Sequence, residues 1–249
     1  MNQKKSIAQD NASLTFVGVG PGDPSLITFA GIQAIKNASV IAYPIANENE
    51  ESIAAQIASP WIDSRQRRLP LVFPMVEDPN LRKAAWRIAR EKVISYIEND
   101  KKVVFISQGD VSIFSTSAYL LLGIKSDCPH CKITQIPGIT SFCAAAAIGD
   151  FPLCLQNDQL LISPTPDTPE EIYSLLDEAA KSRCVVVFVK LGHRWEWVKD
   201  ILQRKNLLEN SLFAQRVGFA DQEVINASCV SKEIKSYFSL VIIRQNWPS

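Results

Sequence analysis

The sequence predicts an α/β fold with largely parallel sheets. From Leu14 to Arg244, short apolar runs of strand length alternate with stretches of helical periodicity, and this alternation is typical of α/β proteins. The chain has 249 residues, of which 47% are hydrophobic and 21% are charged, a balance that favours a globular core over disorder. Its length suits either one large domain or two of modest size.

The expected domain division has three parts. We expect residues 1–13 to form a loose, disordered polar tail, residues 14–136 an N-terminal α/β lobe, and residues 137–249 a C-terminal α/β lobe. The two lobes are divided at Pro137-Gly138, because a proline followed by a glycine is typical of a turn or hinge.

The elements expected in the first lobe begin with an apolar strand that runs into a glycine-rich loop. The strands that follow are short, and several end at a proline or a glycine, which are typical strand terminators. A long helix is supported by apolar residues at helical spacing from Leu81 to Ile97, with basic residues on other faces. In chain order, the expected elements are a strand over 14–19, a helix over 27–38, strands over 40–43 and 69–73, a helix over 81–97, and strands over 102–107 and 133–136.

The elements expected in the second lobe begin with an alanine-rich helix that follows Pro137-Gly138. The run over 184–190 is almost entirely valine and phenylalanine, as expected of a strand that is buried on both faces. In chain order, the expected elements are a helix over 140–148, a strand over 159–162, a helix over 169–181, a strand over 184–190, a helix over 195–204, and strands over 213–218 and 237–244.

Charge and hydropathy exclude several classes of protein. Lys+Arg and Asp+Glu number 26 each, so the basic excess typical of a nucleic-acid binder is absent. No run approaches the roughly 18 apolar residues that a membrane helix needs, and Lys4-Lys5 is not followed by the apolar region of a signal peptide. We therefore expect no nucleic-acid partner, no membrane association and a cytoplasmic location.

The chain contains six cysteines. Four stand singly in apolar runs, which is typical of reduced core cysteines. They are Cys143, Cys154, Cys184 and Cys229. The other two belong to a single Cys-Pro-His-Cys motif over 128–131, whereas a structural zinc site needs a second pair of ligands. We expect this motif to be a loop with two free thiols, and we expect no metal site.

Three loops that follow predicted strands carry the candidate chemistry, because ligands of parallel α/β sheets gather at the carboxyl ends of the strands. The first loop reads Val-Gly-Val-Gly-Pro-Gly-Asp-Pro over 17–24, the second contains Gly109-Asp110, and the third reads Pro-Gly-Ile-Thr-Ser over 137–141. The glycine spacing of the first loop matches neither a dinucleotide-binding fingerprint nor a Walker loop.

Each loop, taken alone, has two interpretations. The alternate glycines of the first loop either leave backbone amides open to a ligand or form a tight turn against a helix. Asp110 either holds a ligand or acts as a base, or it caps the following helix. In the third loop, Thr140 and Ser141 either contact a ligand or cap the helix that follows.

Together, in this order and spacing, the loops resemble the tetrapyrrole methylase family, the S-adenosylmethionine (SAM) enzymes of cobalamin and sirohaem biosynthesis. The resemblance covers essentially Leu14 to Arg244. Tyr43-Pro44, Phe73-Pro74-Met75 and the strand that ends at Lys190 are most similar to members that methylate the C-20 meso carbon of precorrin-2 or its cobalt-bound counterpart. Val111 stands where the family usually has proline.

The resemblance implies a fold, a cofactor and site residues. It implies two α/β lobes with a ligand cleft between them, a homodimer, and SAM held in the cleft largely by backbone, with S-adenosylhomocysteine as product. The residues expected to contact SAM are Pro21, Gly109, Asp110, Ile113, Thr140 and Ser141. Those expected to face the tetrapyrrole are Gly20, Gly22, Asp23 and Arg216. Asp110 is the candidate base, and Lys190 is the candidate for balancing charge or holding a substrate carboxylate.

Other functions remain open. The chain resembles, less closely, family members that act at another ring position, and the same fold carries methylases of RNA or protein. A non-catalytic binder of SAM or a tetrapyrrole is a third class. Phe73-Pro74-Met75 and Lys190 favour the C-20 reaction, zero net charge disfavours RNA as the substrate, and the presence of Asp110 and Lys190 disfavours a non-catalytic binder.

Overall fold

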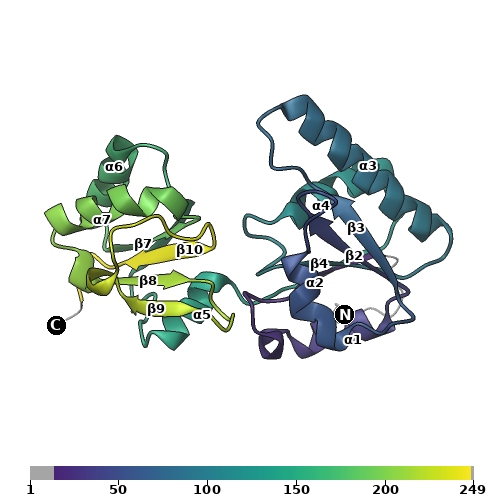
Figure 1. Cartoon of the computed structure of the whole chain (residues 1–249), viewed down its shortest axis with the longest axis horizontal. Coiled ribbons are helices and arrows are strands. Elements are labelled where there is room, and N and C mark those ends of the chain that lie inside the picture. The colour runs from purple at the N-terminus through teal and green to yellow at the C-terminus, as the bar shows by residue number, and fades with distance from the viewer. Residues whose placement is uncertain (1–13, 248–249) are drawn as a thin grey trace, which may run out of the picture. The chain divides into compact units, whose positions relative to one another are not determined.

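The computed structural model describes residues 14–247, which form two compact units (Figure 1). The first unit runs to Thr140 and the second begins at Ser141, close to the division that the sequence suggests at Pro137-Gly138. Each unit has its own sheet and helices, so the predicted α/β class is confirmed. The tail predicted over 1–13 lies outside the described residues.

The first unit is built on a five-stranded sheet whose neighbouring strands are all parallel, in the order β3-β2-β4-β1-β5. β1 therefore lies between two strands that come much later in the chain. The register pairs Gly18 with Ser107 and Val17 with Ile136, so β1, β4 and β5 end at the same edge. The strands are β1 Leu14–Gly18, β2 Val40–Ile45, β3 Arg67–Val72, β4 Val103–Ser107 and β5 Ile133–Ile136.

The helices of the first unit begin at residues that cap helices well. The Thr28 hydroxyl accepts a hydrogen bond from the amide of Gly31 at the start of α1, and Asp78 precedes Pro79 at the first position of α3. The helices are α1 Phe29–Asn37, α2 Ile53–Ala58, α3 Pro79–Glu98 and α4 Thr116–Asp127. The sequence did not predict α2, which is only six residues long, or α4, whose apolar residues are contiguous and show little helical period.

The core of the first unit lies between the sheet and the pair formed by α3 and α4. The rings of Phe16 on β1 and Phe105 on β4 are 5.6 Å apart, and both residues are fully buried. Val93 on α3 and Leu120 on α4 pack into the same cluster. Figure 1 shows α1 on the opposite side of the sheet from α3, so the strands of the centre are covered on both faces.

The second unit carries a mixed sheet in the order β6-β7-β10-β8-β9. Among its described strands, β6 and β7 are parallel and the other neighbours are antiparallel, so the prediction of largely parallel sheets is wrong for this unit. Parallel strands need a long crossover; α6 supplies one between β6 and β7, whereas residues 216–222 are too few to supply one between β8 and β9. The strands are β6 Gln159–Pro164, β7 Cys184–Val189, β8 Ser211–Gln215, β9 Glu223–Asn226 and β10 Ser239–Ile243, and the helices are α5 Ser141–Ile148, α6 Pro169–Lys181 and α7 Trp195–Arg204.

The core of the second unit is centred on Trp195, the first residue of α7. Its ring lies 4.8 Å from that of Phe213 on β8, and its indole nitrogen donates to the carbonyl of Ser231 at 3.0 Å. Just past β10, buried Arg244 forms an ion pair with Asp158. Across residues 14–247, no helix combines the length and the apolar character that crossing a membrane requires.

Candidate functional site

The three loops predicted from the sequence meet at one edge of the first sheet. They follow β1, β4 and β5, which are neighbours in space and end in register. The first two loops are joined by a backbone bridge in which the amide of Gly109 donates to the carbonyl of Gly20 at 2.7 Å, and the amide of Gly20 donates to the carbonyl of Gly109 at 3.2 Å. Gly20 was expected to face the substrate and Gly109 to contact the cofactor, and the two residues are thus directly hydrogen-bonded to each other.

Two glycines allow the loops to pack backbone against backbone. A Cβ atom placed on Gly138 would lie 2.1 Å from the carbonyl oxygen of Gly109, and one placed on Gly18 would lie 2.6 Å from that same oxygen. Real Cβ atoms do not come so close to a backbone carbonyl, so any side chain at either position must displace a neighbouring loop. Close packing of three loops therefore accounts for the glycines at positions 18 and 138.

Three of the loop glycines have amides that are bonded within the protein and are not open to a ligand in the way the sequence suggests. The amides of Gly20 and Gly109 bond each other's carbonyls, and the amide of Gly138 donates to the Asp110 carboxylate. Gly109 nevertheless offers room: its φ is +68°, and a Cβ placed there would meet no heavy atom within 4 Å. A ligand can therefore approach the backbone of Gly109 closely, at the centre of the three loops.

Asp110 joins the second loop to the third. One carboxylate oxygen accepts from the amide of Gly138 at 2.9 Å, and the other accepts from the amide and the hydroxyl of Ser112, at 2.8 and 2.5 Å. Partial burial acts to raise the pKa of Asp110, but the hydrogen bonds donated by Ser112, Gly138 and Val111 outweigh it and hold the pKa below its usual value. Asp110 is therefore ionised at neutral pH and is a weaker base than an ordinary aspartate.

Asp110 does not cap the following helix. A capping residue stands directly before its helix, but α4 begins only at Thr116, six residues after Asp110. The residue that caps α4 is Ser115, whose hydroxyl accepts a hydrogen bond from the amide of Ser117. The capping interpretation of Asp110 is therefore wrong. Its carboxylate binds a neighbouring loop instead.

Gln108 is a residue of this site that the sequence reasoning did not single out. Its side-chain nitrogen donates to the carbonyl of Pro21 at 3.0 Å, which adds a second link between the first and second loops. Its place directly before Gly109, at the end of a strand, was the available signal, because a polar side chain at a strand end can reach the next strand's loop.

The remaining expected residues of the first unit lie on the same loops. Pro21 and Gly22 are buried. Asp23 caps the short 3-10 helix Pro24–Leu26 and accepts from the amide of Ser25 at 2.7 Å; hydrogen bonds from Ser25 lower its pKa. Ile113 is exposed on the second loop. Thr140 ends the first unit and Ser141 begins α5 of the second.

Lys190 and Arg216 lie at one edge of the second unit's sheet. Lys190 directly follows β7 and Arg216 directly follows β8; both strands pair with β10, which begins at this edge with Ser239. Their φ angles are +61° and +49°, a left-handed conformation that costs a non-glycine residue about 1–2 kcal/mol. Residues held in such a conformation are found preferentially at functional sites.

Both side chains contact neighbours within their own unit. The Lys190 ammonium lies 5.8 Å from the centre of the Tyr237 ring. The Arg216 guanidinium donates to the Asp221 carboxylate at 2.6 Å and lies 4.7 Å from the Phe219 ring. Arg216 is therefore paired with an acid of its own, and a substrate carboxylate would have to share it with Asp221.

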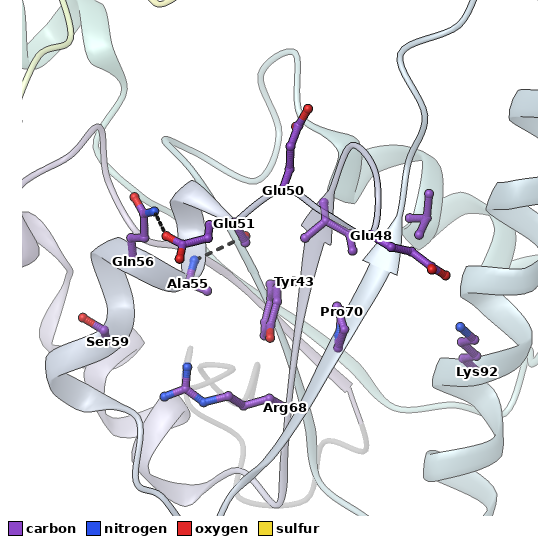
Figure 2. A pocket seen from close by; sticks show the side chains of 13 residues that line it. Tyr43, Glu48, Glu50, Glu51, Ala55, Gln56, Ser59, Arg68, Pro70 and Lys92 are labelled. Atoms are coloured by element: carbon purple, nitrogen blue, oxygen red, sulfur yellow. Dashed lines mark hydrogen bonds between the residues drawn. The ribbon is translucent and has the colours of Figure 1, made fainter.

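A cavity of about 680 Å³ in the first unit lies away from the glycine loops, over one face of β2 and β3 and beside α2 (Figure 2). Figure 2 shows Glu51 beside Gln56 of α2, Glu50 higher in the view, and Arg68 below Tyr43. The lining residues are Tyr43, Ile45, Glu48, Glu50, Glu51, Ser52, Ala55, Gln56, Ser59, Arg68, Pro70, Val72 and Lys92. Three carboxylates against two cations make this cavity a poor match for a ligand that is itself rich in carboxylates.

The cysteines differ from expectation. Cys128 and Cys131 form a disulfide, so the prediction of two free thiols is wrong. Their sulfurs and the His130 ring offer three possible ligand atoms within 4.8 Å of one another, but disulfide sulfurs are not the thiolates that a zinc ion binds. Of the four remaining cysteines, Cys184 is buried, whereas Cys143, Cys154 and Cys229 are exposed, so the core position expected of these three is wrong. Cys143 lies on an outward face of α5.

Comparisons with known proteins agree on one family. The model of the tetrapyrrole (corrin/porphyrin) methylases matches residues 13–230. The cobalamin biosynthesis protein CobIJ of Mycobacterium tuberculosis is 28% identical over 91% of this chain and 45% of its own length, so the chain spans about half of that relative. The cobalt-precorrin-2 C(20)-methyltransferase of Salmonella typhimurium is 26% identical over 95% of this chain and 98% of its own length.

Solved structures show the same fold. The cobalt precorrin-4 methyltransferase CbiF aligns with a TM-score of 0.69 at 18% identity, over 93% of this chain and 94% of that one. A uroporphyrin-III C-methyltransferase from Thermus thermophilus, solved with S-adenyl homocysteine, aligns with a TM-score of 0.61 at 17% identity, over 93% and 92% of the two chains. At these identities the likeness concerns the fold alone.

Proposed function

The chain belongs to the tetrapyrrole (corrin/porphyrin) methylase family, and from this premise we propose that it transfers a methyl group from SAM to the C-20 meso carbon of precorrin-2 or of its cobalt-bound counterpart. Family membership supports SAM as the methyl donor, and a structural neighbour was solved with the demethylated product. The choice of C-20 is supported by two relatives named for that reaction, from Salmonella typhimurium and Methanocaldococcus jannaschii, each matched over more than nine-tenths of both chains.

The observation that carries this proposal is the backbone pairing of Gly20 with Gly109 beside the Asp110–Gly138 hydrogen bond. Three strand-end loops are fixed to one another without a charged anchor for a phosphate. The open space at Gly109 fits a ligand that lies against backbone, as expected of SAM in this family. The residues present therefore fit the cofactor.

When bound, SAM supplies an electrophilic methyl on a sulfonium sulfur. The reduced macrocycle is electron-rich, so the carbon–carbon bond at C-20 forms as the carbon–sulfur bond breaks, and the proton on C-20 must then leave. The loops serve to hold the acceptor carbon, the methyl and the sulfur in line, and such positioning supplies much of the rate. We assign acceptance of the proton to Asp110, which is ionised and directly follows Gly109.

Two cations of the second unit are our candidates for binding the carboxylates of the substrate. Lys190 and Arg216 share one sheet edge and are both held in the left-handed conformation. We assign them to the carboxylates of the tetrapyrrole, which charge-assisted hydrogen bonds bind strongly. Of the two, Arg216 is partly neutralised by Asp221, with which a substrate carboxylate would compete.

The decisive experiment follows the methyl group. Purified protein is incubated with SAM labelled in the methyl group and, in parallel, with metal-free precorrin-2, cobalt-precorrin-2, uroporphyrinogen III or bulk RNA. We expect label in a precorrin-2 product whose C-20 position is identified by NMR. Label on another ring carbon supports a family member of different regiospecificity, which the fold likeness to CbiF allows; label in RNA would overturn the assignment to tetrapyrroles.

We also propose that the chain forms a homodimer. Four large apolar side chains on α3 and α4 of the first unit are exposed, and exposed apolar side chains are common at subunit interfaces. They are Leu81, Ile88, Tyr119 and Leu122. Sedimentation at micromolar concentration should give a species of twice the 27.7 kDa chain mass, and Leu122→Glu should shift it to the monomer. A single species of chain mass for the unmodified protein contradicts the proposal.

A further inference from the structure

A chain of three buried serine hydroxyls lies beneath the loop that carries Gly109 and Asp110. Ser107 is the last residue of β4, Ser115 caps α4, and Ser117 stands in its first turn. The Ser107 and Ser115 oxygens are 2.7 Å apart, the Ser115 and Ser117 oxygens are 2.6 Å apart, and the Ser117 hydroxyl donates to the carbonyl of Val111 at 2.7 Å. All three serines are buried.

The direction of this chain follows from its last bond. A carbonyl oxygen can only accept, so the single hydrogen of Ser117 goes to Val111. Ser117 must then accept from Ser115, and Ser115 must in turn accept from Ser107. Every hydroxyl hydrogen is thereby used inside the protein, and the chain ends on an amide carbonyl rather than on a titratable group. The arrangement is thus a structural tie and not a path for protons.

The serine hydrogen bonds join the two ends of the loop to each other and anchor its middle to α4. Ser107 and Ser115 are the residues where the loop leaves β4 and enters α4, and Ser117 reaches back to Val111, the residue after Asp110. The loop between them contains Phe114 in a left-handed conformation, with φ of +47°. Such a conformation is costly and persists only where the surroundings impose it, so this loop depends on the bonds that hold it.

We propose that Ser107, Ser115 and Ser117 are positioning residues of the cofactor site: their hydroxyl chain fixes the backbone of Gly109 and Asp110 in the form that binds SAM. The inference rests on the proposed function, because it assigns the cofactor to this loop. The serines act through the loop and touch neither the cofactor nor the reacting atoms. Breaking the serine hydroxyl chain should therefore weaken cofactor binding by more than the accompanying loss of folding stability can explain.

The second unit of the protein contains a residue that serves as a matched control. Ser117 and Ser211 are each 1% exposed, and each hydroxyl donates to a backbone carbonyl at 2.7 Å, that of Val111 for Ser117 and that of Leu207 for Ser211. Ser117→Ala and Ser211→Ala each free a backbone carbonyl at the same depth, and Ser117→Ala also leaves the Ser115 hydroxyl without its acceptor. Both should lower the melting temperature, Ser117→Ala by somewhat more, and they differ in whether the freed carbonyl belongs to the Gly109 loop.

The test is the affinity for S-adenosylhomocysteine, measured by calorimetry beside the melting temperature of each protein. We expect Ser117→Ala to bind it about tenfold more weakly, which corresponds to about 1.4 kcal/mol, and Ser211→Ala to bind it as the unmodified protein does. If Ser117→Ala does not fold, Ser107→Ala replaces it, because that change leaves no carbonyl unpaired; its affinity should fall about threefold, near 0.6 kcal/mol by the same relation.

Each outcome decides between distinct claims. Unmodified affinity in the folded serine variant of the first unit overturns the positioning role and leaves the proposed function intact. Equal weakening in Ser211→Ala also overturns it, because general loss of stability would then explain the effect. If the unmodified protein itself does not bind S-adenosylhomocysteine, the proposed function fails together with this inference.

Discussion

The carboxylate of Asp110 accepts a hydrogen bond of 2.9 Å from the backbone amide of Gly138, 28 residues further along the chain. This bond joins the loop after β4 to the loop after β5, although β1 lies between those strands. The same carboxylate is our candidate for accepting a proton. Asp110 thus has a structural and a chemical assignment, and the experiments below separate them.

Asp110→Asn should slow methyl transfer at saturating SAM by about 10²-fold, near the lower end of the range for a positioned acid/base group, because the hydrogen bonds that keep Asp110 ionised also weaken it as a base. The affinity for S-adenosylhomocysteine should change by less than about tenfold. Single-turnover kinetics give the rate. Ser112→Ala is the control: it removes one donor to Asp110, the Ser112 hydroxyl, and keeps the carboxylate, so it should retain most of the rate. A near-normal rate for Asp110→Asn would end the catalytic assignment.

The stability difference between the unmodified protein and Asp110→Asn should depend on pH in a defined direction. The folded pKa of Asp110 is lowered from its ordinary value of 3.8, so the folded state binds the proton less readily than the unfolded state does. The contribution of Asp110 is therefore complete above that ordinary value and is lost as the pH falls through the folded pKa. Urea unfolding of both proteins from pH 7 down to pH 3 should show the difference narrowing only below about pH 4. A difference that widens on acidification would contradict the lowered pKa.

Gly138→Ala should destabilise the protein by about 3 kcal/mol, the upper part of the usual cost of overpacking, because the added Cβ would lie 2.1 Å from the Gly109 carbonyl. It should also weaken S-adenosylhomocysteine binding, since the second loop must move. Gly192→Ala is the comparison: its φ is +54° but its Cβ would meet no heavy atom within 4 Å, so it should cost only about 1 kcal/mol. Equal costs for the two variants would show that crowding is not the reason for Gly138.

Alkylation should distinguish the cysteines. In denaturant without a reductant, four of the six cysteines should react, and Cys128 and Cys131 should become reactive only after reduction, because they are joined in a disulfide. Mass spectrometry of the labelled peptides assigns each site. Reaction of all six before reduction contradicts the disulfide. Stoichiometric zinc that is lost in Cys131→Ser would instead show that the Cys128–Cys131 motif is a metal site.

Lys190→Met should weaken tetrapyrrole binding by about tenfold, the loss expected for one charge-assisted hydrogen bond, and should leave S-adenosylhomocysteine affinity unchanged. Fluorescence titration with the tetrapyrrole and calorimetry with the cofactor product measure the two affinities. Lys232→Met is the control, because Lys232 is paired with Asp200 on the same unit and has no place in the proposed site. Equal weakening in both variants would mean that overall charge, and not Lys190, attracts the substrate.

Much of the fold could be predicted because its signals are local. Alternating apolar runs marked the parallel strands of the first unit, and the helix predicted over 169–181 is α6, which Thr168 caps and Pro169 begins. Strand direction in the second unit depends on which strands pair, and β10 lies between β7 and β8 although it follows both in the chain. No local pattern records that choice, so the antiparallel pairs were missed.

The candidate site was predicted in its parts but not in its connections. Glycines at strand ends correctly marked the loops that meet, whereas the reason for Gly18 and Gly138 is contact between loops, which sequence spacing does not reveal. Asp110 looked like a helix cap or a free carboxylate because its partner, Gly138, is distant in sequence. The serine chain was missed because Ser107 and Ser115 come within hydrogen-bond distance only once the loop between them is folded.

The position of β1 in the first sheet determines how much of the chain must be synthesised before the cofactor site can form. β1 is synthesised first, yet its two neighbours, β4 and β5, begin at residues 103 and 133. A nascent chain that has not yet released residue 138 from the ribosome lacks the amide that Asp110 binds and the glycine that packs against Gly109. The glycine-rich opening of the sequence therefore leaves the ribosome long before its binding partners do, and no shorter N-terminal fragment can hold the cofactor in the manner described. Cofactor capture during translation must wait for the last strand of the first unit, so truncated products of this chain should compete neither for SAM nor for the tetrapyrrole.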